Sequence, residues 1–201
     1  MAALNEPYSG AIEYDSRKGK DAADTACHRQ SRGFMGTFKA FLASRNEYLN
    51  SIVREEDRDL PIVNMRKQLL FDSWYNMFNE SGAMFDINEV QILSFQGRNV
   101  VIDPIWPNKV VWHGGDSTGQ LYPQNHCNEW TSDDPNSYGV ASPLKNQKLL
   151  DDEHLYTCDQ KLIVLCVEVV NTQHKTRHRQ HRIRRTYSQK SRLRDNKSRS
   201  P

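Results

Sequence analysis

The chain has 201 residues, of which 37% are hydrophobic and 26% are charged, which is an ordinary composition for a globular protein. This length allows one domain with a proper core, or at most two small domains. No apolar run approaches the roughly 18 residues that a membrane-spanning helix needs, so the sequence predicts no membrane span.

The net charge of +2 conceals a strong asymmetry along the chain. Residues 175–201 contain 11 Lys and Arg against one Asp, a net charge of +10, whereas residues 1–174 carry 16 basic against 24 acidic residues, a net charge of −8. The division predicts an acidic globular part followed by a basic arm. Such an arm could bind a polyanion or nucleic acid. It could also be a basic run of the nuclear-targeting type or the product of a mis-predicted exon.

Three segments have helical patterns. Asp24–Arg32 has helical composition and ends before Gly33, a C-terminal stop signal. Ser51–Arg58 predicts a short helical turn region. Ser73–Phe78 follows Asp72, a good N-cap, and places its apolar residues on one face.

The strand signals are short. Val90–Phe95 and Val100–Ile102 flank Gln96-Gly97 and predict a hairpin, and Val110–Trp112 predicts a further strand. Leu162–Val170 is apolar at nearly every position, which predicts a central strand covered on both faces. The mixture indicates an α+β fold with short strands and few helices.

The pattern divides the chain into two parts. Residues 1–172 are expected to form one domain, with a first strand that is incomplete at Met1. Its long irregular stretch, Gly114–Asn146, is rich in Gly, Ser, Asp, Asn and Pro. Residues 173–201 have almost no apolar side chains, so we expect them to be a disordered basic tail.

Four cysteines are present, and none belongs to a CxxC pair. This pattern favours two disulfides in an oxidising compartment over a zinc site, and it leaves three connectivities open. The first residues, MAALNEPYSG, lack the features of a signal peptide, so we expect a piece of a longer secreted precursor. A cytosolic protein with four reduced thiols is the alternative.

No catalytic or cofactor-binding motif is present: the sequence contains neither a GxSxG elbow nor a phosphate loop. The histidines predict no metal site either. His28, His113, His126 and His154 are scattered without ligand spacing. The remaining three have helical spacing but lie among many cations: His174, His178 and His181. We therefore expect no enzyme, no metal and no cofactor.

Three further features give weaker signals. The four tryptophans could stack on sugars, as in a lectin, but their positions favour core packing: Trp74, Trp106, Trp112 and Trp130. A carboxylate-rich calcium lectin loop is only faintly echoed by Asp133, Asp134 and Asn136. Asn79-Glu80-Ser81 and Asn196-Lys197-Ser198 are glycosylation sequons, of which Asn79 has the more favourable context for a secreted chain.

Several stretches together resemble the endostatin domain, which ends the type XV and XVIII collagens of basement membranes. They are GTFKAFLASR (36–45), SIVREEDRDLPIVN (51–64), LLFDSW (69–74), ILSFQGRNVV (92–101), WPNKVVWHG (106–114) and LIVLCVE (162–168). The resemblance implies a compact C-type-lectin-like α+β fold and nested disulfides, Cys27–Cys166 around Cys127–Cys158.

The resemblance also implies a function. It implies a secreted, non-enzymatic module of the extracellular matrix, carried by a collagen trimer and involved in cell adhesion, cell migration or angiogenesis. The implied partners are heparan sulfate or another polyanion, matrix proteins and integrin-type receptors. The alternative that remains open is a calcium-independent, lectin-like carbohydrate-binding domain.

The chain departs from the family at its binding surfaces. Lys67 stands where the family's zinc-binding aspartate would lie, and Thr131 replaces a heparin-binding arginine. Arg54 and Arg58 match the heparin surface, but Glu55 replaces a neighbouring arginine. Three basic residues of a longer loop could partly substitute: Arg17, Lys18 and Lys20.

The folded part is therefore expected to bind polyanions poorly. We expect the tail to supply most of this binding through its arginines, notably Arg177, Arg179, Arg182, Arg184 and Arg185.

Overall fold

The computed structural model describes residues 1–151 and 154–170. Its strands are β1 (Ala2–Ala3), β2 (Glu13–Tyr14), β3 (Arg17–Lys18), β4 (Thr37–Ala40), β5 (Ile62–Val63), β6 (Leu69–Phe71), β7 (Val110–Trp112), β8 (Tyr138–Pro143), β9 (Leu155–Thr157) and β10 (Ile163–Val170). Its helices are α1 (Gly19–Gln30) and α2 (Cys127–Trp130), with 3-10 turns η1 (Leu49–Ser51), η2 (Glu55–Asp57), η3 (Tyr75–Phe78) and η4 (Leu144–Asn146). The predicted α+β mixture of short strands and few helices is confirmed.

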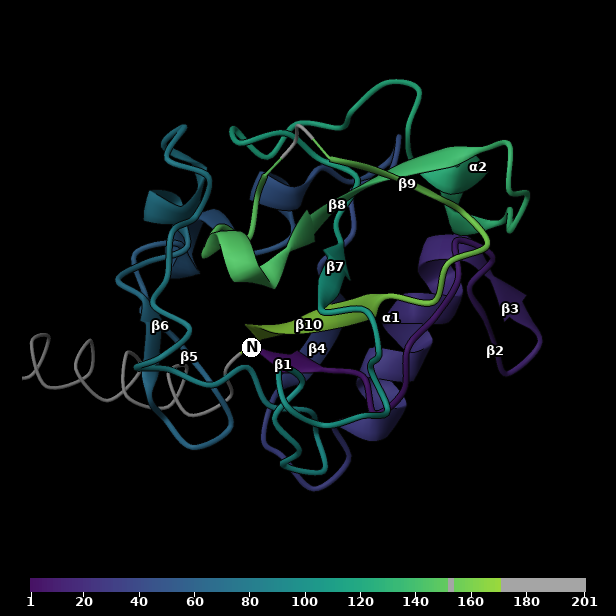
Figure 1. The fold of residues 1–201 in the computed structure, drawn as a ribbon. Coiled ribbons are helices and arrows are strands. Elements are labelled where there is room, and N and C mark those ends of the chain that lie inside the picture. The colour runs from purple at the N-terminus through teal and green to yellow at the C-terminus, as the bar shows by residue number, and fades with distance from the viewer. Residues whose placement is uncertain (152–153, 171–201) are drawn as a thin grey trace, which may run out of the picture.

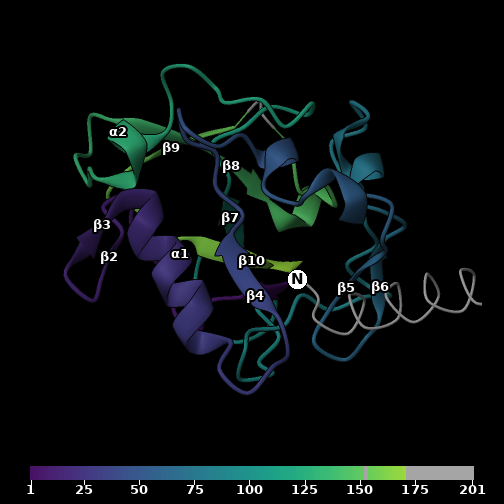
Figure 2. The ribbon, with the colours of Figure 1, turned by 180° about the vertical axis from the view of Figure 1, so that it is seen from behind.

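One sheet of six strands organises the domain (Figure 1). Its order is β1-β10-β7-β8-β9, and β4 also pairs with β10. The β10–β7 pair is parallel and the other pairs are antiparallel. Separate two-stranded pairs, β2-β3 and β5-β6, lie on opposite sides of the molecule in both views (Figures 1 and 2).

Strand β10 is the central strand that the sequence predicts. Its side chains alternate between two apolar clusters: Leu165 and Val167 belong to one, and Val164 and Cys166 to the other. Because successive side chains of a strand point to opposite faces, a run of apolar residues can serve two cores at once. The strand predicted at Val110–Trp112 is also confirmed and has the same alternation.

Helix α1 packs on β4 through small residues, with Ala22, Ala26 and Cys27 buried on one face. The predicted helix at Asp24–Arg32 began too late, because the observed helix starts at Gly19, directly after the β2-β3 hairpin. The start has no capping side chain: Lys18 is the extended N-cap residue and makes no side-chain cap bond. No capping signal therefore marked the start in the sequence.

The other two helical predictions were too long. Ser51–Arg58 contains the last residue of one 3-10 turn, η1, and the whole of a second, η2. The segment Ser73–Phe78 forms one 3-10 turn, η3, and Ser73 rather than Asp72 accepts the Asn76 backbone N–H through its hydroxyl. The predicted apolar face is nevertheless buried, because Trp74 and Met77 lie in the core.

The predicted hairpin around Gln96-Gly97 has the expected turn, with Gly97 at a φ of 78°, but its arms are not strands. Only a single antiparallel bridge joins Leu93 to Asn99. Ala3 pairs with the other edge of the first arm: its N–H donates to the Leu93 carbonyl, and its carbonyl accepts from the Phe95 N–H. None of the helices within the described residues is long and apolar enough to cross a membrane.

Candidate functional site

Both disulfides are nested, as the resemblance implies. Cys27 of α1 is bonded to Cys166 of β10, with Cα atoms 5.7 Å apart, and Cys127 of α2 is bonded to Cys158, with Cα atoms 5.6 Å apart. All four cysteines belong to the same buried cluster. The bonds therefore join α1 and α2 to the sheet and position the surfaces on that side of the molecule.

The Cys127–Cys158 bond holds an unusual turn. Four successive residues, Cys127–Trp130, have φ angles of 48°, 50°, 59° and 64°, which is left-handed backbone that L-residues rarely adopt. The buried Trp130 indole N–H donates to the Ala43 carbonyl at 2.7 Å and fixes the end of the turn. Gly10 fits against it only because it has no Cβ, which would lie 2.4 Å from the Cys127 sulfur.

The predicted basic loop, Arg17, Lys18 and Lys20, is divided by the fold. Arg17 and Lys18 are exposed on the β3 strand, where Lys18 pairs with Glu13 at 2.7 Å. Lys20 faces inward: its ammonium contacts Asp24 at 3.0 Å and Glu47 at 2.9 Å, and its side chain is only 10% exposed. Lys20 is thus committed to an internal ion pair.

The same internal network constrains Glu47. Lys39 reaches the second oxygen of this carboxylate at 2.6 Å. Although burial opposes ionisation, the two neighbouring ammonium groups lower the pKa of Glu47 below its usual value. The network ties α1, β4 and the segment after β4 together.

Arg54 and Arg58 flank η2, whose three residues are all acidic. Arg54 lies 3.9 Å from Glu56, and the Arg58 Nε–H donates to the Val53 carbonyl at 3.1 Å. With Asp59 next in the chain, the local charge is negative. This negative charge opposes the approach of a polyanion to either arginine.

A basic groove that the sequence did not predict lies along α1. It has a volume of about 470 Å³ and is lined by Arg17 together with His28, Arg29, Arg32 and Lys39, and by Asp15 and Asp24. Arg29 pairs with Asp15 at 3.2 Å, whereas Arg17 and Arg32 have no acidic partner within the described residues. His28 and Arg32 are four residues apart and both lie within the predicted helix Asp24–Arg32, so this spacing was the available sequence signal for the groove.

A buried histidine and serine resemble a catalytic pair but lack its chemistry. The Gly115 N–H donates to His113 Nδ1 at 3.3 Å, so the ring proton lies on Nε2, which donates to Ser142 Oγ at 2.9 Å. The serine oxygen also accepts from the Asp151 N–H at 2.6 Å. His113 is fully buried, and burial lowers its pKa to about 4, so the imidazole is neutral at pH 7. Its hydrogen bond to Ser142 of β8, together with the bond from Asp151, joins the end of β7 to β8 and to the segment after η4.

The other predicted positions are spread over the surface and the core. All four tryptophans are fully buried, so none forms a sugar-stacking platform. Lys67 is exposed in the β5-β6 turn, and no group of three metal-ligating side chains occurs among the described residues. Asn79 is exposed after η3, and its Oδ1 accepts from the Ser81 N–H at 3.1 Å. The histidines and arginines of 173–201 lie outside the described residues.

Comparisons with known proteins agree with this architecture. The family model described as "Collagenase NC10 and Endostatin" matches residues 1–172. The human collagen alpha-1(XVIII) chain is 40% identical over 171 residues, which cover 84% of this chain and 9% of that protein. The present chain thus spans about a tenth of the length of this relative. With the family match covering nearly all of the described residues and both disulfides in place, the chain belongs to the endostatin family.

Proposed function

We propose that the chain is a non-enzymatic, C-type-lectin-like module of the extracellular matrix that binds heparan sulfate or a similar polyanion. The parent molecule would be a secreted, collagen-type trimer of the basement membrane, and matrix proteins or integrin-type receptors would be further partners in adhesion or migration. Family membership supports the matrix setting. Catalysis finds no support in the His113–Ser142 pair, because the His113 ring already donates its proton to Ser142.

The division of charge carries the polyanion assignment. Residues 1–174 have a net charge of −8 and residues 175–201 a net charge of +10. Lys20 is paired with two carboxylates, and Arg54 and Arg58 stand among acidic side chains. Sulfated chains should therefore bind mainly to the tail, by counterion release, with a secondary contribution from the α1 groove.

Heparin chromatography of the full chain tests this assignment. A variant with three of the tail arginines changed to Gln, Arg177→Gln with Arg179→Gln and Arg182→Gln, should elute at lower salt than the wild type. A matched variant of the folded part, Arg17→Gln with Arg29→Gln and Arg32→Gln, should shift less. If the folded-part variant causes the larger shift, the α1 groove and not the tail is the binding site.

A glycan array separates the matrix module from the lectin alternative. The buried position of all four tryptophans gives no support to stacking on neutral sugars. The proposal expects binding to sulfated glycans that weakens with salt. Selective, salt-insensitive binding to neutral sugars would favour the lectin.

We also propose that Asn79 carries an N-linked glycan when the chain is secreted. Its side chain is exposed at the end of a 3-10 turn, ahead of Glu80 and Gly82 in left-handed backbone. Glycosidase treatment of the secreted chain should lower its mass, and Asn79→Gln should remove this change. An unchanged shift in the variant would assign the glycan to another site.

A further inference from the structure

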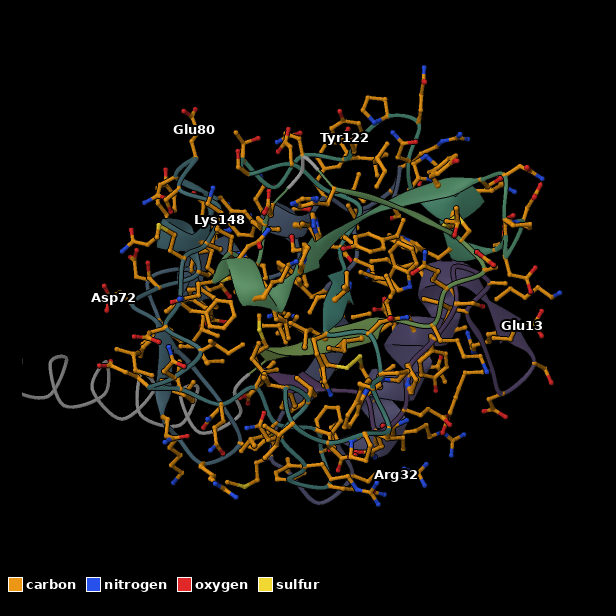
Figure 3. The ribbon with its side chains drawn as sticks, in the orientation of Figure 1. Glu13, Arg32, Asp72, Glu80, Tyr122 and Lys148 are labelled. Carbon is orange, nitrogen blue, oxygen red and sulfur yellow. A yellow bond between two sulfur atoms is a disulfide. The ribbon has the colours of Figure 1, made fainter. Side chains whose placement is uncertain are left out.

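An acidic groove lies between β6, η3 and the segment that follows η3. It has a volume of about 510 Å³. All charged residues that line it are acidic: Asp72, Asp86 and Glu89. None of them forms an ion pair within the described residues, so each of the three carboxylates is available to a basic partner. In Figure 3, Asp72 and Glu80 project from this side of the molecule, where Lys148 also lies.

The groove also has an apolar component. Leu69 is 49% exposed and Met84 is 63% exposed, and both belong to its lining. A carboxylate rim beside exposed aliphatic side chains suits arginine, whose stem can cover apolar surface while its guanidinium pairs with a carboxylate. Lysine can pair with the same carboxylates, but its compact, strongly hydrated ammonium lacks the planar fork of arginine.

The basic end of the chain starts close to this groove. Val169, the penultimate residue of β10, lines a small hollow together with Ile62 of β5. Ile62 pairs with Phe71 of β6, which lines the acidic groove. Arg177 follows Val170 by seven residues, which span up to about 23 Å when extended. The first tail arginines can therefore reach the groove without crossing the molecule.

We propose that the β6–η3 groove, in the chain without a glycan at Asn79, binds the chain's own basic segment, residues 173–201, and that this contact competes with polyanions for the segment. The two parts have opposite net charges, −8 and +10. The docked segment would be masked from sulfated chains at low salt and released by salt or by a sufficiently dense polyanion. The competition rests on the proposed function, whereas the contact itself does not.

Zero-length carbodiimide cross-linking of the full chain tests the contact. We use an Asn79→Gln background, because Asn79 lines the groove and a glycan there would cover it. Peptide mapping should find Lys175 or Lys190 joined to Asp72, Asp86 or Glu89, and high salt should abolish these products. If the lysines of the segment link to acidic residues elsewhere, or not at all, the contact is overturned.

Isotope mixing separates docking within one chain from docking between chains. An equimolar mixture of unlabelled and nitrogen-15-labelled protein should give only products in which both peptides carry the same label. Mixed-label products would overturn docking within one chain and would indicate that the groove takes the segment of a second copy.

Heparin chromatography of the full chain tests the competition. In the same Asn79→Gln background, the groove variant Asp72→Asn with Asp86→Asn and Glu89→Gln should elute at higher salt than a control with the same change in net charge. The control is Asp21→Asn with Asp133→Asn and Asp159→Asn, three exposed acidic residues outside the groove. Equal elution of the two variants overturns the competition. If no form binds heparin, the proposed function fails, and the cross-links still decide whether the contact exists.

Discussion

The two faces of the central sheet have differently built cores, although the same strands supply both. On the α1 face, one cluster contains all four cysteines together with Trp112 and Trp130. On the opposite face, the other cluster contains no cysteine and includes Trp74, Trp106 and several large aliphatic and aromatic residues. Figures 1 and 2 show α1 on one side of the sheet, and β5 and β6 on the other.

The size of the side chains explains the difference. Helix α1 buries mainly Ala22, Ala23, Ala26 and Cys27, and small side chains remove little apolar area from water. A covalent bond to β10 compensates for the weak packing. The opposite face buries large side chains, which hold loops and 3-10 turns on the sheet without a cross-link. Four predictions test this comparison, from the largest expected effect to the smallest.

Removal of the Cys27–Cys166 bond should have the largest effect. The bond closes a segment with a sequence separation of 139, against 31 for Cys127–Cys158. In the chain-entropy model, the paired change Cys27→Ala with Cys166→Ala lowers the free energy of unfolding by about 4–5 kcal/mol, and Cys127→Ala with Cys158→Ala by about 3–4 kcal/mol. Urea unfolding followed by tryptophan fluorescence measures both. The reverse order would show that local packing around α2, and not the length of the closed segment, dominates.

Combining single substitutions with the removal of a disulfide should show that the two clusters contribute independently to stability. Leu165→Ala should lower the free energy of unfolding by about 3 kcal/mol, since it opens a cavity in the cluster without cysteines. Its effect should add to that of removing Cys127–Cys158, to within about 0.5 kcal/mol. Trp130→Phe, in the same cluster as this disulfide, should deviate from additivity by more than that. Additivity for Trp130 and coupling for Leu165 would contradict the division into two cores.

His113 should make the fold sensitive to acid. Its pKa is lowered by burial to about 4, below the ordinary value near 6.5, so the unfolded chain binds the proton more readily than the folded one. The contribution of His113 to the free energy of unfolding is on the order of 3 kcal/mol. It is fully present above about pH 6.5 and is lost as the pH falls towards 4. Unfolding measured at pH 7 and pH 4.5 should show a smaller difference for His113→Gln than for the wild type. An equal difference in both would assign the acid sensitivity to other groups.

The ion pairs of Glu47 should have a smaller effect. Glu47→Gln keeps the shape but removes the charge opposite Lys20 and Lys39, and should lower the free energy of unfolding by about 1–2 kcal/mol at pH 7. Because the pKa of Glu47 is lowered, the contribution is present above the ordinary value of 4.5 and is lost as the pH falls through the folded value. Glu13→Gln at the exposed Lys18 pair is the matched control, with little change expected. Equal effects of the two changes would show that burial of the network adds nothing.

Local pattern predicted some elements well and others poorly. The strands at Val110–Trp112 and within Leu162–Val170 were predictable because long-range burial on both faces leaves a continuous apolar run. The start of α1 was not predictable, because no capping residue marks it and the preceding hairpin sets its position. The arms around Gln96-Gly97 have a strand-like sequence, but they form only one bridge to each other, and the first arm pairs along its other edge with Ala3, which is far away in the sequence.

Binding surfaces show the same limit. The sequence placed Arg17, Lys18 and Lys20 in one basic loop, but which side of the chain each faces depends on the packing of α1 against β4. That packing directs Lys20 towards Glu47 and leaves Arg17 beside Arg32 in a groove. The acidic groove beside β6 likewise combines Asp72 with Asp86 and Glu89 through a fold in the chain.

The sequence by itself determined the α+β class, the central strand, the division of charge and, through its motifs, the family. Each of these depends only on composition or on residues that are contiguous in the chain. Only the tertiary structure decided which cysteines are bonded, which basic residues remain free and where the grooves lie. These features depend on residues that are far apart in the sequence and are brought together when both faces of β10 are covered.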